Sequence, residues 1–218
     1  RTPSSAASDV YKRQTEMPAE MARPPADGGA DTMASASPAS PAEPRTMTRE
    51  ELVRQYGGTD ESEAAVAAGL NWLRKHQRAD GSWRFHHTTP QCDATCDQVG
   101  NFRGTTLGST ALTLLACMGA GNNSISGELQ PSVEAGLRYI LSGARLVPAG
   151  LDLRADSEGD SAMYVQAIGT ICLCEAAALA DSTIKAAGKG TRRIGDKSRK
   201  QAVAEARELR QAAQAALR

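Results

Sequence analysis

The chain has 218 residues, enough for one good hydrophobic core or two small ones, and its 25 basic and 25 acidic side chains give a formal net charge of zero. Because no surplus of positive charge creates a field that would attract nucleic acid, no nucleic-acid partner is expected. Aromatic residues make up 4% of the chain and runs of β-branched residues are short, which favours an all-α fold over a sheet.

Residues 1–45 are rich in Ala, Pro, Ser, Gly and Asp and contain few branched apolar side chains. Such a segment cannot bury enough apolar surface to offset the entropy of ordering its backbone, so we predict a disordered low-complexity linker. Its first fourteen residues, 1–14, resemble translated sequencing-adaptor sequence and are excluded from the fold as an artefact. The folded domain is expected to span residues 46–218.

Capping residues and apolar residues at helical spacing predict six helices in this domain. They span residues 48–55, 61–76, 105–118, 131–142, 161–179 and 198–218. The helices at 105–118 and 161–179 are small or apolar on almost every face, which is typical of helices that other helices enclose. From residue 61 onward, amphipathic and enclosed helices therefore alternate along the chain.

An internal repeat accompanies this alternation. The segment "VAAGLNWL" at 66–73 matches "VEAGLRYI" at 133–140, with Gly69 aligned with Gly136 and Trp72 aligned with Tyr139. A third copy begins at "AQAAL", residues 213–217. Repeat units of this kind bury their apolar faces against neighbouring units. We expect the array to be truncated at the C-terminus, which would leave an open edge.

The first copy continues into a longer motif, G-x-x-W-L-x-x-x-Q-x-x-x-G-x-W. Its six fixed positions are Gly69, Trp72, Leu73, Gln77, Gly81 and Trp83. The motif resembles the glutamine and tryptophan repeat of squalene and terpene cyclases and the related repeat of protein prenyltransferases. The resemblance covers residues 49–218 and is nearest to the prenyltransferase/squalene-cyclase repeat proteins of planctomycete-type bacteria. It implies a partial α/α toroid, in which outer helices alternate with inner helices around an apolar cavity.

We interpret the motif as structural rather than catalytic. Gly69 is expected to let two helices approach closely, and Trp72 to bury apolar area together with the leucine that follows it. Gln77 falls at the end of a helix, where its amide can bond free carbonyls. Gly81 belongs to a turn, after which Trp83 can stack on the glutamine.

The resemblance leaves two functions open. In one, the chain is a terpene-cyclase-like or prenyltransferase-like domain that binds or transforms an isoprenoid lipid in the toroid cavity. In the other, it is a non-catalytic scaffold that binds protein or lipid at the bacterial cell envelope. The D-x-D-D acid motif of squalene-type cyclases is absent from the sequence, and two Phe, two Trp and four Tyr are few for a cavity that stabilises carbocations.

The candidate catalytic acids are Asp156, Asp160 and Glu175. We interpret the first two as acids at a helix N-terminus, where they meet the positive end of the helix dipole, with catalysis as the alternative. Glu175, in an enclosed helix, requires a partner, a solvent-facing position or a shifted pKa.

A loop after Trp83 carries the chemically richest cluster, "FHHTTPQCDATCD". Its candidate metal ligands are His86, His87, Cys92, Cys96 and Asp97. Two thiols and an imidazole suit zinc, the one cofactor that the sequence suggests. A disulfide between Cys92 and Cys96, or a loop of unbridged thiols, explains the cluster as well. The zinc ligands of prenyltransferases come from different repeats, so this local cluster does not match them.

The last part of the chain is basic, with ten Lys or Arg against four Asp or Glu between residues 181 and 218. We interpret much of it as a solvated, flexible loop, with an anionic headgroup or a phosphate as the alternative partner. No uninterrupted apolar run reaches the ~18 residues of a membrane span, and the longest, at 167–180, contains Glu175. No transmembrane segment is therefore expected, and the sequence indicates no compartment.

Overall fold

The computed structural model describes residues 57–87, 96, 105–155, 157 and 160–218. The chain divides into two units, Arg1–Ser37 and Pro38–Arg218, and every described residue belongs to the second unit. The predicted linker at 1–45 and the predicted helix at 48–55 lie outside the described residues.

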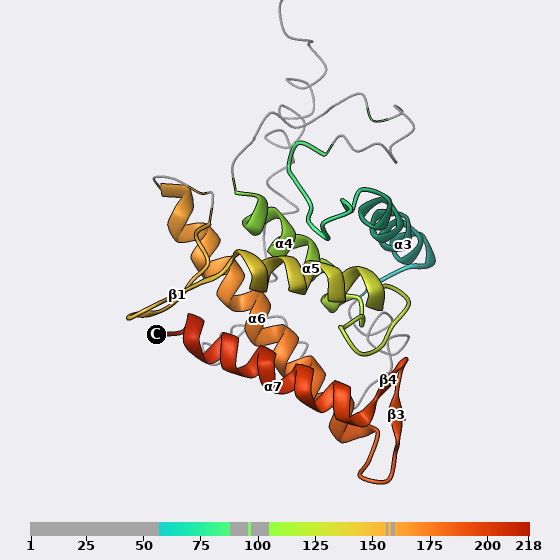
Figure 1. Cartoon of the computed structure of the whole chain (residues 1–218). Helices are drawn as coiled ribbons and strands as arrows, with labels where there is room; N and C mark the ends of the chain where they lie inside the picture. Colours follow the sequence, from blue (N-terminus) through green and yellow to red (C-terminus); the bar gives the residue numbers. More distant parts are fainter. Residues whose placement is uncertain (1–56, 88–95, 97–104, 156, 158–159) are drawn as a thin grey trace, which may run out of the picture. The chain divides into compact units, whose positions relative to one another are not determined.

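Five α-helices and two short β-hairpins make up the described part of the chain (Figure 1). The helices are α3 (Asp60–Lys75), α4 (Thr106–Gly119), α5 (Gln130–Gly143), α6 (Asp160–Ala186) and α7 (Arg199–Ala216). The strands are β1 (Arg145–Val147), β2 (Gly150–Asp152), β3 (Arg193–Ile194) and β4 (Lys197–Ser198), paired antiparallel as β1–β2 and β3–β4. The predicted helical fold class is confirmed, and the two hairpins are additions that the sequence pattern did not predict.

Capping boxes start α3 and α7. The Thr59 hydroxyl accepts a 3.2 Å hydrogen bond from the backbone N–H of Ser62, whose own hydroxyl accepts one from the backbone of Thr59 at 3.0 Å. Ser198 and Gln201 make the same exchange at the start of α7. Each box satisfies two amides that the first helical turn leaves without a partner, so these residues fix where the two helices begin.

The helices pack in alternation. α4 packs against α3, α5 and α6, while α6 packs against α4 and α7 (Figure 1). The two enclosed helices, α4 and α6, thus lie against each other, and each has an amphipathic helix on its flank. The predicted enclosure of α4 and α6 is only partial, because Leu112 of α4 and Ile171 of α6 are 43% and 53% exposed.

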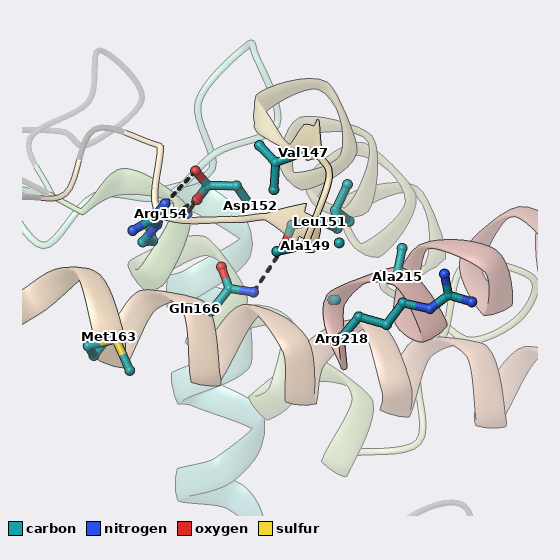
Figure 2. Close-up of a pocket in the computed structure, with 11 residues that line it drawn as sticks. Val147, Ala149, Leu151, Asp152, Arg154, Met163, Gln166, Ala215 and Arg218 are labelled. Carbon is teal, nitrogen blue, oxygen red and sulfur yellow. Dashed lines mark hydrogen bonds and ion pairs between the residues drawn. The ribbon is translucent and has the colours of Figure 1, made fainter.

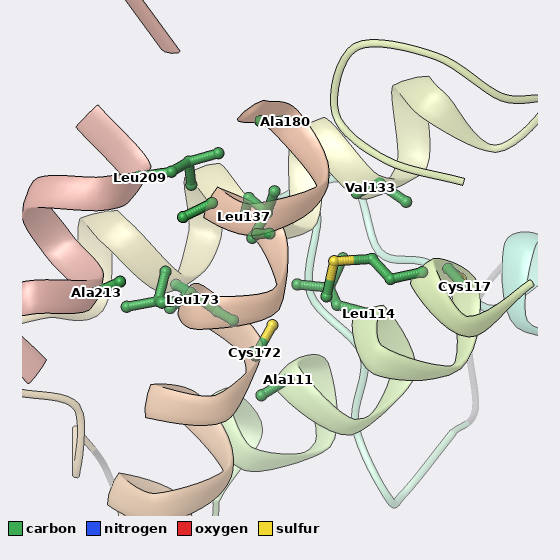
Figure 3. Packing of buried hydrophobic residues seen from close by; sticks show 14 of the residues in the cluster. Ala111, Leu114, Cys117, Val133, Leu137, Cys172, Leu173, Ala180, Leu209 and Ala213 are labelled. Atoms are coloured by element: carbon green, nitrogen blue, oxygen red, sulfur yellow. The ribbon is translucent and has the colours of Figure 1, made fainter. Parts of the chain in front are cut away.

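The hydrophobic core lies where four of these helices meet (Figure 3). Leu114 of α4, Leu137 of α5, Leu173 of α6 and Leu209 of α7 are all at most 3% exposed. Small residues let the enclosed helices approach each other: a Cβ atom on Gly108 of α4 would lie 3.0 Å from the Val165 side chain of α6. Each Å² of apolar surface that these side chains remove from water stabilises the folded state by about 25 cal/mol.

α6 is longer than predicted. It continues past residue 179 to Ala186, through a charged segment that interrupts the apolar pattern. Of the described residues, only the stretch 161–186 of α6 is long and apolar enough to cross a membrane, and this rests on length and composition alone. One such helix is weak evidence, because core helices of soluble proteins share these features, and α6 packs on both α4 and α7.

Part of the basic segment is ordered. Ile194 of β3 is buried, and the side chain of Lys197 in β4 is only 13% exposed. The Lys197 ammonium group lies between the carboxylates of Glu134, at 3.2 Å, and Glu205. The prediction of a solvated loop is therefore wrong for Ile194 and Lys197, because Ile194 is buried and Lys197 forms a double ion pair with α5 and α7. The other exposed residues of the hairpin, Arg193, Gly195 and Asp196, are solvated as predicted.

Candidate functional site

Gln77 joins the end of α3 to the start of α5. Its side-chain nitrogen Nε2 donates hydrogen bonds to the backbone oxygens of Gly81, at 3.0 Å, and Ser132, at 2.9 Å. An amide nitrogen has two hydrogens to donate, and both are used. The acceptors are carbonyls of the following turn and of α5, rather than the last carbonyls of α3 as predicted.

Trp83 is buried between three helices. Its indole Nε1 donates to the Leu73 oxygen of α3 at 2.7 Å, and its backbone N–H donates to the Thr110 hydroxyl of α4 at 3.0 Å. A Cβ atom on Gly136 of α5 would lie 2.9 Å from the indole ring, so a glycine is needed there. The side chains of Gln77 and Trp83 each donate hydrogen bonds to backbone oxygens, and the stacking of Trp83 on Gln77 stays a prediction.

Gly81 places the turn between them directly on the backbone of α5. Its φ angle is +88°, in the left-handed region that favours glycine. A Cβ atom at this position would overlap the backbone carbonyl of Ala135. The turn after α3 therefore meets the next amphipathic helix main chain to main chain.

The β1–β2 hairpin makes the same kind of contact in the next sequence repeat. Gly150 has a φ angle of +139°, and a Cβ atom there would overlap the backbone carbonyl of Ala215 in α7. Aligning "VEAGL" at 133–137 with "AQAAL" at 213–217 places Ala135 opposite Ala215. The glycine of each loop thus touches the same position of the repeat in the next helix.

A buried residue lies shortly after each of these glycines: Trp83 two residues after Gly81, and Leu153 three residues after Gly150. Leu153 is fully buried, as Trp83 nearly is, and its backbone N–H donates to the Gln166 side chain of α6 at 2.9 Å. Gln166 in turn donates to the Leu151 oxygen at 3.0 Å (Figure 2). In both units, the loop after an amphipathic helix is therefore fixed to a polar side chain of an enclosed helix: Thr110 in the first unit and Gln166 in the second.

Two residues of the first copy lack the packing that was predicted for them. A Cβ atom on Gly69 would meet no atom within 4 Å, and Trp72 is 38% exposed. The reason is that α3 buries no residue along its length, whereas Gly136 in the second copy lies against both Leu114 and Trp83. Tyr139, the partner of Trp72 in the alignment, is half-buried.

The two candidate acids whose backbone the structure describes, Asp160 and Glu175, lie far apart on α6. Asp156 and the side chain of Asp160 lie outside the described residues, although Asp160 begins α6. Glu175 is half-buried on the same helix, fifteen residues further on. At 1.5 Å per residue the two positions are about 22 Å apart along the helix axis, too far to act on one atom.

A charged cluster in the β1–β2 hairpin was missed by the sequence analysis (Figure 2). Asp152 of β2 is buried and accepts two hydrogen bonds from the Arg154 guanidinium, at 2.8 and 2.9 Å, with Arg145 at 3.5 Å. The hydrogen bonds from Arg154 lower the pKa of Asp152 to about 2. The D-x-R spacing, which puts both side chains on one side of an extended chain, is the signal that could have identified this pair. It borders a pocket of about 200 Å³.

The histidine and cysteine loop is described only in part. His86 and His87 are half-buried, Cys96 is half-buried, and the remaining candidates, Cys92 and Asp97, lie outside the described residues. Among the residues that the structure describes, no three His, Cys, Asp or Glu side chains are placed to hold one metal ion. Zinc at this loop therefore stays a prediction.

A residue that the sequence analysis did not count as a ligand faces this loop. His76, at the end of α3, is 5% exposed, and its Nε2 atom lies 3.4 Å from the Sγ atom of Cys96. The His87 ring stands edge-on to it, with the ring centroids 5.7 Å apart. The 20-residue separation between His76 and Cys96 is not a recognisable spacing, so the sequence offered no signal for this pair.

The enclosed helices leave apolar side chains uncovered. These residues, which we call the apolar stripe, are Leu112 and Ala116 of α4 and Tyr164, Ala167 and Ile171 of α6. Leu112 is 43% exposed, Ile171 53% and Tyr164 70%. They recur at helical spacing, so each enclosed helix presents an apolar line opposite its buried face. Large exposed apolar residues along one side of a helix are candidates for a binding surface.

No protein-family model, curated protein or solved structure matches the chain. A function is therefore supported only by the repeat motif and by the contacts described above.

Proposed function

We propose that the chain is part of an α/α-toroid repeat protein of the terpenoid-cyclase and prenyltransferase type, and that its apolar stripe binds the hydrocarbon chain of an isoprenoid lipid. The observation that carries the proposal is the location of the stripe on α4 and α6. These helices are already packed on their other faces, so the stripe is a second apolar face that requires a partner of its own.

The toroid is supported by the repeated loop contacts. Gly81 meets Ala135 and Gly150 meets Ala215 at equivalent positions of the repeat. When each unit is placed on the next by the same contact, the units follow one another with a constant rotation, as in other repeat proteins. A constant rotation with alternating layers is what an α/α toroid requires.

The chemistry of the stripe favours a neutral hydrocarbon. α4 contains no charged residue, and neither does α6 between Ser161 and Cys174. Each methylene group of a ligand that leaves water against such a surface contributes about 0.8 kcal/mol. Asp160 and Glu175 are too far apart for acid catalysis on one atom, so the proposal is one of lipid binding and assigns no reaction.

Equilibrium binding of a fluorescent farnesol analogue to the purified protein tests the proposal. Leu112→Asp and Ile171→Asp each place a charge in the stripe, and each is expected to weaken binding at least about tenfold, since a buried unpaired charge costs several kcal/mol. Val203→Asp is the matched control, because Val203 is an exposed apolar residue on α7, 46% exposed, outside the stripe. It is expected to bind as the wild type does.

Two results would contradict the proposal. If the stripe variants bind the analogue as tightly as Val203→Asp does, the stripe is not the lipid site and the scaffold alternative is favoured. If a straight-chain alcohol with the same number of carbons binds equally well, the isoprenoid part of the proposal is wrong.

A further inference from the structure

A group of cations lies where α6 ends and α7 begins (Figure 1). Residues 185–200 contain seven Lys or Arg against one Asp, and they run from the last turn of α6 through the β3–β4 hairpin into the first turn of α7. One of the seven, Lys197, is held by the carboxylates of α5 and α7. The other six, none of which is buried, form what we call the basic end: Lys185, Lys189, Arg192, Arg193, Arg199 and Lys200.

Backbone contacts bring the basic end together. The backbone N–H of Arg199 donates a 2.8 Å hydrogen bond to the backbone oxygen of Arg192. This bond continues the β3–β4 pairing by one residue, so the two arginines stand opposite each other. The Arg199 side chain donates in turn to the backbone oxygen of Gly188. The turn after α6, the hairpin and the first turn of α7 therefore lie side by side.

The fold leaves the charges of the basic end uncompensated. None of its six side chains forms an ion pair with a residue that the structure describes, whereas Arg210, further along α7, pairs with Asp181. Like charges opposite each other on paired strands repel. Arg199 and Lys200 also occupy the first turn of α7, where the helix dipole disfavours cations. An anionic partner would relieve both unfavourable interactions.

The composition of this surface distinguishes between classes of anionic partner. Residues 181–218 contain no Phe, Trp or Tyr, so this part of the chain has no aromatic ring to stack on the bases of a nucleic acid. A bilayer with anionic headgroups attracts several cations at once by charge alone. Because the formal net charge of the chain is zero, such an attraction acts through one end of the molecule.

We propose that the basic end docks the protein on an anionic phospholipid bilayer, with the β3–β4 hairpin and the first turn of α7 against the headgroups. Each guanidinium group there can donate two parallel hydrogen bonds to a headgroup phosphate, which a lysine cannot. The inference does not depend on lipid binding by the apolar stripe, because it concerns headgroup charge, and none of the stripe residues is charged.

Co-sedimentation of the full chain with vesicles tests the proposal. Vesicles of phosphatidylcholine with phosphatidylglycerol should bind the protein, and vesicles of phosphatidylcholine alone should not. The double variant Lys189→Gln with Arg192→Gln is expected to bind the mixed vesicles at least about tenfold more weakly, since each cation near the surface contributes about fivefold. Arg74→Gln with Lys75→Gln is the matched control, because it removes the same charge from α3, and it should bind within about twofold of the wild type.

A second variant and a change of salt make the test independent of one substitution. Arg193→Gln with Lys200→Gln should weaken binding by a similar factor, and circular dichroism shows whether each variant is folded. Raising the NaCl concentration from about 0.1 M to about 1 M should weaken wild-type binding at least about tenfold, because the Debye length falls from about 10 Å to about 3 Å.

Three outcomes would overturn the inference. The first is equal binding to neutral and to anionic vesicles, which would point to the apolar stripe instead. The second is binding by both folded basic-end variants that is as tight as that of the α3 control. The third is tighter binding to a single-stranded oligonucleotide than to vesicles at the same phosphate concentration, which would make a nucleic acid the partner.

Discussion

The indole nitrogen of Trp83 donates a 2.7 Å hydrogen bond to the backbone oxygen of Leu73. This bond ties the segment after α3 back to the last turn of that helix, while the ring itself is 3% exposed between α4 and α5. One side chain thus supplies both buried area and a specific donor, and the two contributions can be separated by mutation.

Trp83→Phe is expected to lower the free energy of unfolding by about 1–2 kcal/mol, because the aromatic ring stays buried while the indole donor is lost. Trp83→Ala should cost about 3–5 kcal/mol, since it also leaves a cavity. Urea denaturation measures both. Trp72→Phe is the control, with an expected cost below about 1 kcal/mol because that ring is 38% exposed. If substitution of Trp83 and of Trp72 lowered the free energy of unfolding equally, the proposed structural role of the buried Trp83 would be contradicted.

Gly81→Ala and Gly150→Ala are expected to destabilise the protein more than a left-handed backbone alone explains. The φ angle costs about 1–2 kcal/mol, and the overlap with a carbonyl adds about 1–3 kcal/mol. Gly188→Ala measures the cost of the positive φ angle alone, because Gly188 has φ +73° and open space around it. Denaturation curves of the three variants give the difference. If Gly188→Ala is as damaging as the other two, the loop contacts are not what holds the units together.

Gln77→Glu should cost about 2–3 kcal/mol, because it removes a donor to two carbonyl oxygens and brings a carboxylate toward them. Gln201→Glu is the matched control. In the α7 capping box the Gln201 side-chain oxygen accepts from the Ser198 backbone at 3.0 Å, and a carboxylate accepts equally well. The change at Gln201 is expected to leave the free energy of unfolding within about 0.5 kcal/mol of the wild-type value. A tolerated Gln77→Glu would argue against the two hydrogen bonds that Gln77 donates.

Asp152 is expected to make the protein acid-sensitive in a defined window. Arg154 holds the pKa of the Asp152 carboxyl near 2, below its value in an unfolded chain of about 3.9. The unfolded state therefore takes up the proton first, and the stabilisation is complete above pH 4 and lost as the pH falls toward 2. Unfolding measured between pH 2 and 6 should show a smaller loss for Asp152→Asn than for the wild type. Arg154→Met should reduce the loss in the same way, and an unchanged slope in both variants would contradict the assignment.

The sequence was most informative about helices. α4 and α5 lie within a residue or two of their predicted bounds, because apolar periodicity and a proline near the start of α5 are local signals. The end of α6 was missed, since Asp181 and Lys185 break the apolar pattern where the helix reaches the surface. The strands were missed as well, because two or three residues are too few to show a period of two.

Long-range partners were beyond the reach of sequence patterns. The motif singled out Gln77, but its contact with Ser132, 55 residues away, depends on how α5 packs. His76 is the last residue of a predicted helix, and its contact with Cys96, 20 residues further along the chain, has no signal in the sequence. The alignment of Ala135 with Ala215 was visible in the sequence, but the glycine that touches each of them was not.

The two glycine contacts have a consequence for how such a chain can evolve. Each brings main-chain atoms directly against main-chain atoms, so no residue larger than glycine fits at either position without a shift of the backbone. Exposed side chains elsewhere on the two loops can change without touching these contacts. Selection is therefore expected to retain two residues that have no side-chain chemistry of their own.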